Sequence, residues 1–333
     1  MQSVDGAGAE TYSGRNGGSR ASRTGPYVPL TRLDSPIGTP LSTIRHIART
    51  LDGNRTVLLT TPHPSTDPAR FMAEADASRY LVGNRVLAAT EFAGPGQGAW
   101  HASPYLPVLP LPAALAVYAG PLPERTVRAL GVALAETLAV IHGQNLTHAG
   151  VSPAAVLIAH DGSRLSGFGA VRAAGPEGVV RRGLPGIDAS VLAPEQAAGG
   201  MPRPLGDVYA LGATLAYAAT GSTAPERDEL PPWLRSVVGR CLSRDPAHRP
   251  QLADLVSELA SAGDPVAQSQ GFGAPDRASA LLGPGWLPAR VVAALAHQAA
   301  TVLAAETAVE PEPEPTPHQP GAAYAAHSHP YAP

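Results

Sequence analysis

Apolar positions recur at helical spacing over much of the chain. The clearest case is Arg125–His142, where one side is apolar and Gly143 follows, which predicts a long helix with a buried face and a glycine stop. Asp67 and Pro68 supply an N-cap and a first helical position, so a second helix is predicted over Ala69–Val82. The same spacing predicts a helix that starts at Asp207 and stops at Gly221, one that begins at Pro231, one over Gln251–Leu259 and an amphipathic one over Trp286–Glu306.

Short runs of apolar and β-branched residues predict strands, most of them in the first third of the chain. Asp161-Gly162 joins two such runs further along, and an Asp-Gly pair in this position predicts a hairpin of Ala155–Ala159 and Ser163–Ser166. The other predicted strands cover Tyr27–Leu33, Thr43–Ala48, Thr56–Thr60, Val86–Phe92 and Tyr105–Leu109.

The two ends of the chain differ in composition from the part between them. Residues 1–26 and the Pro/Ala/His tail 307–333 are predicted to be disordered, and residues 263–285 are predicted to be a Gly/Pro/Ser-rich linker. The polar N-terminus does not have the apolar core of a signal peptide. The nearest candidate for a membrane span, Leu106–Ala119, falls short of the roughly 20 residues needed and contains prolines, so we expect no membrane insertion.

All 24 basic residues of the chain are arginine. Any mechanism that needs a lysine, such as a Schiff base, is therefore excluded. The formal net charge is −3 and the sequence holds no dense basic block, so we expect binding neither to nucleic acid nor to an anionic membrane. Cys241 is the single cysteine, which rules out an intrachain disulfide and is compatible with the reducing cytoplasm.

The most specific pattern lies at Leu146–Ala173, which reads LTHAGVSPAAVLIAHDGSRLSGFGAVRA. It resembles the catalytic centre of bacterial Hanks-type Ser/Thr protein kinases, where a loop His-Arg-Asp-Leu-Lys-Pro-x-Asn precedes a hairpin and then Asp-Phe-Gly. His148 matches the histidine, Pro153 the proline, and Phe168-Gly169 the end of Asp-Phe-Gly. The resemblance covers about residues 27–262 and implies an α+β, bilobal protein-kinase-like fold, with a small β-rich N-lobe at 27–110 and a larger helical C-lobe at 111–262.

The positions that carry kinase chemistry depart from the family pattern. Gly150 stands in place of the catalytic aspartate, and Ser152 in place of the lysine of the catalytic loop. Ala155 replaces the metal-binding asparagine and Gly167 the metal-binding aspartate, while Thr60 occupies the place of the phosphate-anchoring lysine. We therefore expect no catalytic, cofactor-binding or metal-binding residue, and neither ATP nor Mg²⁺ as a cofactor.

The positions to which the resemblance assigns a structural role are retained. Glu195, in Ala193-Pro194-Glu195, is expected to form a buried ion pair with Arg249, and Asp207 to hold the backbone near His148. Glu74 occupies the place of the glutamate that pairs with the missing lysine, so it is expected to be a surface or arginine-paired carboxylate.

Other segments of the resemblance lack the groups that would bind a nucleotide. Asp34–Pro40 falls where kinases carry a Gly-rich loop, but only Gly38 remains and two prolines offer no N–H groups. The hinge between the lobes is likewise rich in proline, at Pro107, Pro110 and Pro112. Arg55 and the pair Arg181-Arg182 are expected to be solvated loop residues in preference to phosphate contacts.

The sequence thus predicts a pseudokinase, a regulatory or protein-binding module of bacterial signalling with an unidentified protein partner. The alternative is an active or weakly active ATP-binding Ser/Thr kinase in which an arginine replaces the lysine. A third possibility is association through the helix at 286–306. That helix could pack back on the domain, self-associate or dock a partner, and packing back is expected first because exposed apolar stripes are usually buried.

Overall fold

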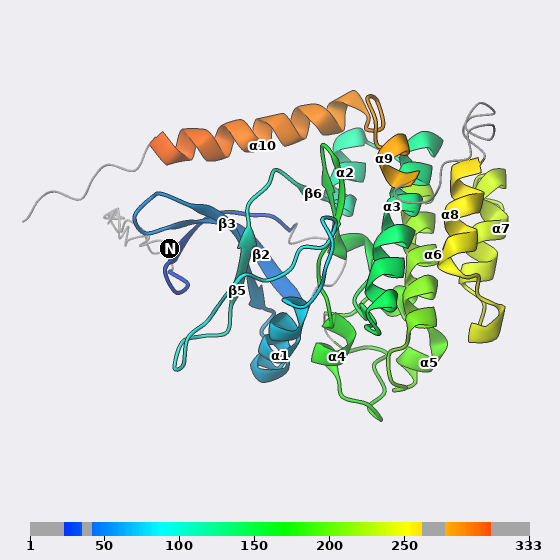
Figure 1. The fold of residues 1–333 in the computed structure, drawn as a ribbon, viewed down its shortest axis with the longest axis horizontal. Coiled ribbons are helices and arrows are strands. Elements are labelled where there is room, and N and C mark those ends of the chain that lie inside the picture. The colour runs from blue at the N-terminus through cyan, green and yellow to red at the C-terminus, as the bar shows by residue number, and fades with distance from the viewer. Residues whose placement is uncertain (1–22, 35–41, 185, 262–276, 308–333) are drawn as a thin grey trace, which may run out of the picture.

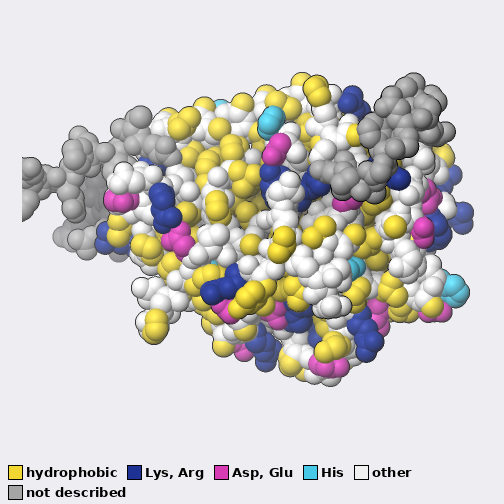
Figure 2. Space-filling model, viewed as in Figure 1, with side chains coloured by type: hydrophobic (Ala, Val, Ile, Leu, Met, Phe, Trp, Pro, Cys, Tyr) yellow, Lys and Arg dark blue, Asp and Glu magenta, His cyan; other side chains and the backbone are white. Residues whose placement is uncertain are grey.

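The computed structural model describes residues 23–34, 42–184, 186–261 and 277–307. These residues form a strand-rich N-terminal lobe and a larger helical C-terminal lobe that lie side by side (Figure 1). Charged side chains of both signs are interspersed over the face seen in Figure 2. The two-lobed α+β arrangement that the sequence predicts is confirmed.

An antiparallel sheet in the order β1-β2-β3-β5-β4 makes up the N-lobe. Side chains alternate between its faces, so Val57 and Leu59 pack with the buried Trp100 on one face. Ile47 and Leu58 point to the other face and pack with residues of the helical lobe. The strands are β1 Tyr27–Arg32, β2 Thr43–Thr50, β3 Thr56–Pro62, β4 Glu91–Phe92 and β5 His101–Pro104.

One helix, α1 (Pro68–Ser78), accompanies the sheet. Asp67 caps it by accepting hydrogen bonds from two backbone N–H groups, as the sequence predicts. The predicted continuation to Val82 is wrong, because the chain leaves the helix in a tight turn with a 3.1 Å hydrogen bond from the Leu81 N–H to Ser78 O. Leu81 is buried in the core of the C-lobe instead, so tertiary packing overrides the helical pattern.

Two predicted strands differ in extent from the observed ones. Val86–Phe92 is a strand only at its end, because the Leu87 N–H donates to Leu165 O of the C-lobe at 2.9 Å. Tyr105–Leu109 is not a strand of the sheet, since β5 ends at Pro104 and Pro107 has no N–H for a ladder. The other predicted strands lie within two residues of the observed ends.

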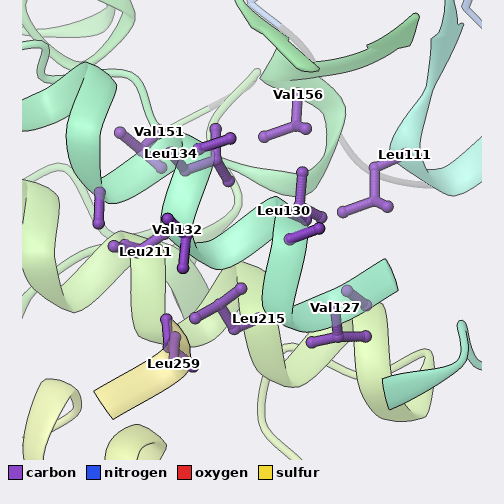
Figure 3. Close-up of a cluster of buried hydrophobic side chains, with 14 of the residues drawn as sticks. Leu111, Val127, Leu130, Val132, Leu134, Val151, Val156, Leu211, Leu215 and Leu259 are labelled. Carbon is purple, nitrogen blue, oxygen red and sulfur yellow. The ribbon is translucent and has the colours of Figure 1, made fainter. Parts of the chain in front are cut away.

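Helix α3 (Glu124–Gly143) is the centre of the C-lobe. Its Leu130 and Leu134 belong to one buried cluster with Leu211 and Leu215 of α6, and α8 contributes Leu259 to the same cluster (Figure 3). The other helices are α2 Leu111–Tyr118, α4 Ala170–Ala174, α5 Pro194–Ala197, α6 Pro204–Thr220, α7 Pro232–Cys241 and α8 Leu252–Ser261, with 3₁₀ turns at Pro153–Ala155, Ala189–Val191 and Pro246–His248.

Helix α3 is long and apolar enough to span a membrane. No other helix among the described residues is. However, 72% of this apolar stretch is buried inside the lobe, which is the position of a core helix.

A small sheet connects the hinge to the predicted hairpin. Its strands are β6 Leu109–Pro110, β7 Val156–Ala159 and β8 Gly162–Leu165, in the order β6-β7-β8. Ala159 pairs with Gly162, so the hairpin turn is His160-Asp161, one residue earlier than predicted.

Two helices follow the C-lobe, α9 (Arg277–Leu281) and α10 (Ala289–Thr307). The predicted start of α10 at Trp286 is wrong, because Pro288 O accepts the first helical hydrogen bonds, from Val291 N and Val292 N. In Figure 1, α10 crosses from the helical lobe to the sheet.

Candidate functional site

The space between the lobes is the candidate site, and it is small. Two cavities lie there, and each has a volume of about 50 Å³. Both are lined by Ser42, Thr43 and Arg45 of the N-lobe and by Ser166 and Gly167 of the C-lobe. Pockets for small molecules of drug size have volumes of roughly 300–1,000 Å³, so neither cavity has room for a nucleoside triphosphate.

The loop that begins at His148 is held by a buried carboxylate. The two oxygens of Asp207, in the first turns of α6, accept hydrogen bonds from the backbone N–H groups of His148 and Ala149, both at 2.8 Å. The Gly169 N–H in turn donates to His148 O at 2.8 Å. The predicted contact between Asp207 and this backbone is therefore present, and it joins the loop to the Phe168-Gly169 segment.

The His148 side chain is fully buried and packs edge-on against Phe168, with ring centroids 5.7 Å apart. Among the described residues, neither of its ring nitrogens has a hydrogen-bond partner. Burial lowers the pKa of His148 to about 4, and burial does the same at His101. Both imidazoles are therefore neutral at pH 7.

These two histidines link the stability of the fold to pH. Below a pH of about 6.5 the unfolded chain binds a proton at each histidine, whereas the folded chain does so only near pH 4. Because the unfolded state binds more protons in this window, stability is lost as the pH falls from about 6.5 to about 4.

Gly150 lies where the resemblance places the catalytic aspartate, and the fold leaves no room for a side chain there. A Cβ atom on Gly150 would lie 1.9 Å from the carbonyl oxygen of Gly167 and 3.2 Å from the Ala170 Cβ. The first of these distances is far inside van der Waals contact and involves backbone. The space of the missing side chain is thus filled by the backbone of Gly167.

The two positions that would hold a metal carry no side-chain oxygen. Gly167 has φ +76°, and a Cβ atom on it would lie 3.5 Å from the Ala155 Cβ. Ser152 keeps its hydroxyl, but uses it to accept a 3.2 Å hydrogen bond from the Ala155 N–H. The described residues hold no group of three or more His, Cys, Asp or Glu side chains that could bind a metal. Mg²⁺ requires hard oxygen ligands, so the residues present do not fit it.

Thr60 and Glu74 lie where a kinase has its lysine–glutamate pair, and they do not pair with each other. Thr60 is buried on β3, opposite Arg45 of β2 and His101 of β5. Glu74 accepts from Arg172 of α4, whose guanidinium nitrogens lie 2.7–2.9 Å from its carboxylate oxygens. The arginine-paired alternative for Glu74 is confirmed. Arg172 was not predicted as its partner.

Arg45 is the functional feature that sequence reasoning missed. It is 4% exposed, and its guanidinium forms a salt bridge with the equally buried Asp34, with Nε 3.0 Å from Oδ1. The same side chain crosses to the C-lobe, where it donates to Ser166 Oγ at 2.8 Å and to Ala154 O at 2.7 Å. An arginine in a strand between apolar neighbours such as Ile44 and Ile47 was the available signal.

Arg45 therefore places a buried ion pair in the cleft and ties the two lobes together. The cation is neutralised within the N-lobe by Asp34, and the guanidinium also donates to Ser166 and Ala154 of the C-lobe.

The expectation for Arg181 is wrong. Its side chain is 1% exposed and donates to four backbone carbonyl oxygens, those of Gly175 at 3.1 Å, Pro176 at 3.2 Å, Gln196 at 3.0 Å and Gly200 at 2.7 Å. Burial lowers its pKa. Arg181 thus stabilises the loop before α5 through hydrogen bonds to its backbone carbonyl groups. Its neighbour Arg182 is exposed, as predicted.

The predicted ion pair between Glu195 and Arg249 forms. The two guanidinium nitrogens lie 2.7 Å and 2.8 Å from the two carboxylate oxygens, a bidentate geometry. The Arg249 side chain is fully buried as predicted, whereas the Glu195 side chain is 34% exposed and therefore less buried than predicted.

Arg55 is 59% exposed and pairs with Glu91 at 2.9 Å, so it does not enter the cleft. Residues 35–40, which fall where kinases carry a Gly-rich loop and were not expected to bind phosphate, lie outside the described residues.

The sheet lobe with one helix, the helical lobe and the loop between them define the protein kinase fold. The structure is similar to the crystal structure of the kinase domain of PknI from Mycobacterium tuberculosis, in a variant with one cysteine replaced by alanine. The TM-score is 0.54 at 23% sequence identity, and the match covers 72% of this chain and 98% of that domain. At this identity the likeness shows the fold alone.

The sequence relatives of the chain are bacterial Ser/Thr protein kinases. The chain is 30% identical over 260 residues to the probable serine/threonine-protein kinase PkwA of Thermomonospora curvata, covering 72% of this chain and 34% of that protein. It is 28% identical over 292 residues to the serine/threonine-protein kinase AfsK of Streptomyces coelicolor, covering 81% and 35%. It thus spans about a third of the length of these curated relatives. No protein-family model matches it. The chain is a homologue of the bacterial Hanks-type Ser/Thr protein kinases and has their fold.

Proposed function

We propose that this chain is a pseudokinase, a protein-kinase-like domain that binds or regulates a protein partner and transfers no phosphate. The observation that carries the proposal is at Gly150. Residue 150 has no side chain, and the fold leaves no space for one, because the Gly167 carbonyl oxygen lies 1.9 Å from the position of a Cβ atom on residue 150.

The chemistry of phosphoryl transfer supports the same conclusion. Transfer depends on a base that orients the nucleophile, on metal ions, and on a cation that holds the phosphates. Loss of a general base alone lowers a rate by roughly 10²–10⁴-fold. Here Gly150, Ala155, Gly167 and Thr60 stand at the positions of the base, both metal ligands and the lysine. Such losses are not additive, but none of them is compensated by a neighbouring side chain of the described cleft.

The filling of the cleft is a second, independent support. Arg45, which is paired with Asp34, lines both of its cavities, and the apolar side chains Leu58 and Leu157 are 1% and 0% exposed where the two lobes meet. A nucleotide would have to displace an ion pair and packed apolar groups to enter.

The alternative is a weakly active ATP-binding kinase with an arginine in place of the lysine. Among the described residues, Arg45 is the arginine that reaches into both cleft cavities, and its guanidinium is already paired with Asp34. We therefore prefer the pseudokinase. We further propose a protein partner and a cytoplasmic location, because the chain has a net charge of −3 with no dense basic block and a single cysteine.

A thermal-shift titration of the full chain with ATP and Mg²⁺ tests the proposal. A ligand present at 100 times its Kd stabilises a protein by about 2.7 kcal/mol, which is readily measured. We expect no saturable rise in Tm. Parallel titrations with ATP and EDTA, and with tripolyphosphate and Mg²⁺, control for general effects of a polyanion. A saturable rise that needs both ATP and Mg²⁺ would establish the alternative.

A further inference from the structure

Helix α10 is fastened to the C-lobe at its beginning. Trp286, just before the helix, is 3% exposed, and its indole N–H donates to His160 O at the β7–β8 turn, at 2.8 Å. The Thr126 hydroxyl of α3 donates to Trp286 O at 2.6 Å. From this anchor the helix runs across to the N-lobe (Figure 1).

At its middle, α10 binds the hinge between the lobes. The Gln298 side-chain amide accepts from the Val108 N–H at 2.9 Å and donates to Val108 O at 2.8 Å. One side chain thus satisfies both backbone groups of a fully buried hinge residue.

At its end, α10 enters the contact between the lobes. Val302 is 4% exposed and packs in one cluster with Ile47 and Leu58 of the sheet and Leu157 of β7. Arg49 of β2, which is 2% exposed, donates to Val302 O at 3.2 Å and to Ala305 O at 2.8 Å. A cation at the last carbonyls of a helix is favourable for its dipole as well as for its hydrogen bonds.

The residues of α10 that face the domain follow a regular 4-3-4 spacing. Val291, Leu295 and Val302 are almost completely buried, and Gln298 lies between them on the same face. The adjoining residues Val292 and Leu303 are 44% and 61% exposed. This is the pattern by which an amphipathic helix binds a groove.

We propose that the groove formed by Arg49, Leu58, Val108 and Leu157 is a helix-binding site, and that α10 is its built-in ligand. Bound there, α10 holds the two lobes together and covers the hinge side of the cleft. Access to this side of the cleft then requires that α10 leave the groove. This binding site is independent of whether the domain transfers phosphate, since none of its contacts uses a catalytic position.

Hydrogen exchange of the full chain tests the proposal with a matched pair of variants. Val302→Asp places a charge in the groove, whereas Leu303→Asp places it on the exposed side of the same helical turn. We expect Val302→Asp to speed exchange of the Val108 amide by at least about tenfold, with the amides of α3 unchanged, and Leu303→Asp to leave Val108 as in the wild type. Unchanged exchange at Val108, or equal effects of the two variants, would overturn the proposal. If Val302→Asp also deprotects α3 and so unfolds the lobe, the milder Val302→Ala, which leaves the Gln298 contacts with Val108 in place, is measured instead.

Binding in trans gives a second test. A labelled peptide of residues 286–307 is titrated into the Val302→Asp chain and into the Leu303→Asp chain, and fluorescence anisotropy is measured. We expect saturable binding to the first and at least about tenfold weaker binding to the second, whose groove is filled by its own helix. Equal binding, or none to the Val302→Asp chain, would refute a helix-binding groove. A wild-type chain of dimeric mass in solution that becomes monomeric with Val302→Asp would assign the helix to a second copy and overturn the assignment in cis.

Discussion

Replacement of Arg45 or Asp34 is predicted to destabilise the protein strongly, and replacement of both is predicted to destabilise it less than either single replacement. The two side chains are 5% and 2% exposed, so neither charge is solvated when its partner is removed. Among the described residues, Arg45→Met leaves the buried Asp34 carboxylate with the backbone N–H of residue 45, at 3.0 Å, as its partner. Asp34→Ala leaves the guanidinium buried, with Ser166 and Ala154 as its acceptors in the described part of the chain.

The magnitude follows from the cost of an uncompensated buried charge. Removal of one partner of a buried ion pair costs about 3–5 kcal/mol, and this range applies to each single variant. In the double variant Asp34→Ala/Arg45→Met no buried charge remains. What remains is the backbone N–H of residue 45 without the Asp34 acceptor and Ala154 O without the Arg45 donor, and each such buried group left unpaired costs about 1–3 kcal/mol, less than a buried charge. The double variant should therefore be more stable than either single variant.

Urea unfolding followed by tryptophan fluorescence measures these differences. Trp100 is buried in the N-lobe and Trp286 in the C-lobe, so the signal reports on both. A single transition at all emission wavelengths would show that the lobes unfold together, which the conversion of midpoints to free energies requires.

The exposed pair Asp76 and Arg79 serves as a matched control. Its side chains are 58% and 46% exposed at a separation of 2.7 Å, and such a pair contributes at most about 1 kcal/mol. The reasoning is refuted if the single variants at 34 and 45 stay within the range of this control, or if their effects simply add in the double variant.

Three further predictions concern the loop and the segment around it. Gly150→Asp should lower Tm without restoring ATP-dependent transfer, whereas Gly143→Ala, at a glycine with open space around it, should change Tm little; transfer by Gly150→Asp would contradict this. His148→Leu should flatten the loss of urea stability between pH 6.5 and 4, by up to about 3 kcal/mol, and an unchanged pH profile would show that this histidine is not the cause. Arg181→Met should expose the segment 176–188 to limited proteolysis, whereas Arg182→Met should not, and equal cleavage rates would contradict the role of the four carbonyl contacts.

Periodic patterns and ordered motifs made much of the fold predictable from the sequence. The helix at 124–143 was predicted to within one residue at each end, because apolar spacing and Gly143 mark its length. The contacts of Asp207 with the loop and of Glu195 with Arg249 could be predicted because the resemblance places these residue types in a fixed order.

The contacts that fill the cleft could not be predicted in this way. Arg45, Arg172 and Arg181 find partners that lie far apart in the sequence or belong to the backbone, such as Ala154 O and Gln196 O. Neither periodicity nor a motif marks such a partner, because any backbone carbonyl can accept and only the fold brings it near. The expectation for Arg181 failed for the same reason.

Loss of the kinase groups and filling of the cleft are connected in the structure. With a side chain at 150, the Gly167 carbonyl could not lie where it does, and the short helix α4 with Arg172 follows directly from this segment. Arg172 forms a salt bridge with Glu74, whose carboxylate would pair with the lysine in a kinase. Reinstating a single catalytic side chain therefore opposes several contacts at once, so the proposal that the domain transfers no phosphate rests on the packed cleft as well as on its residue types.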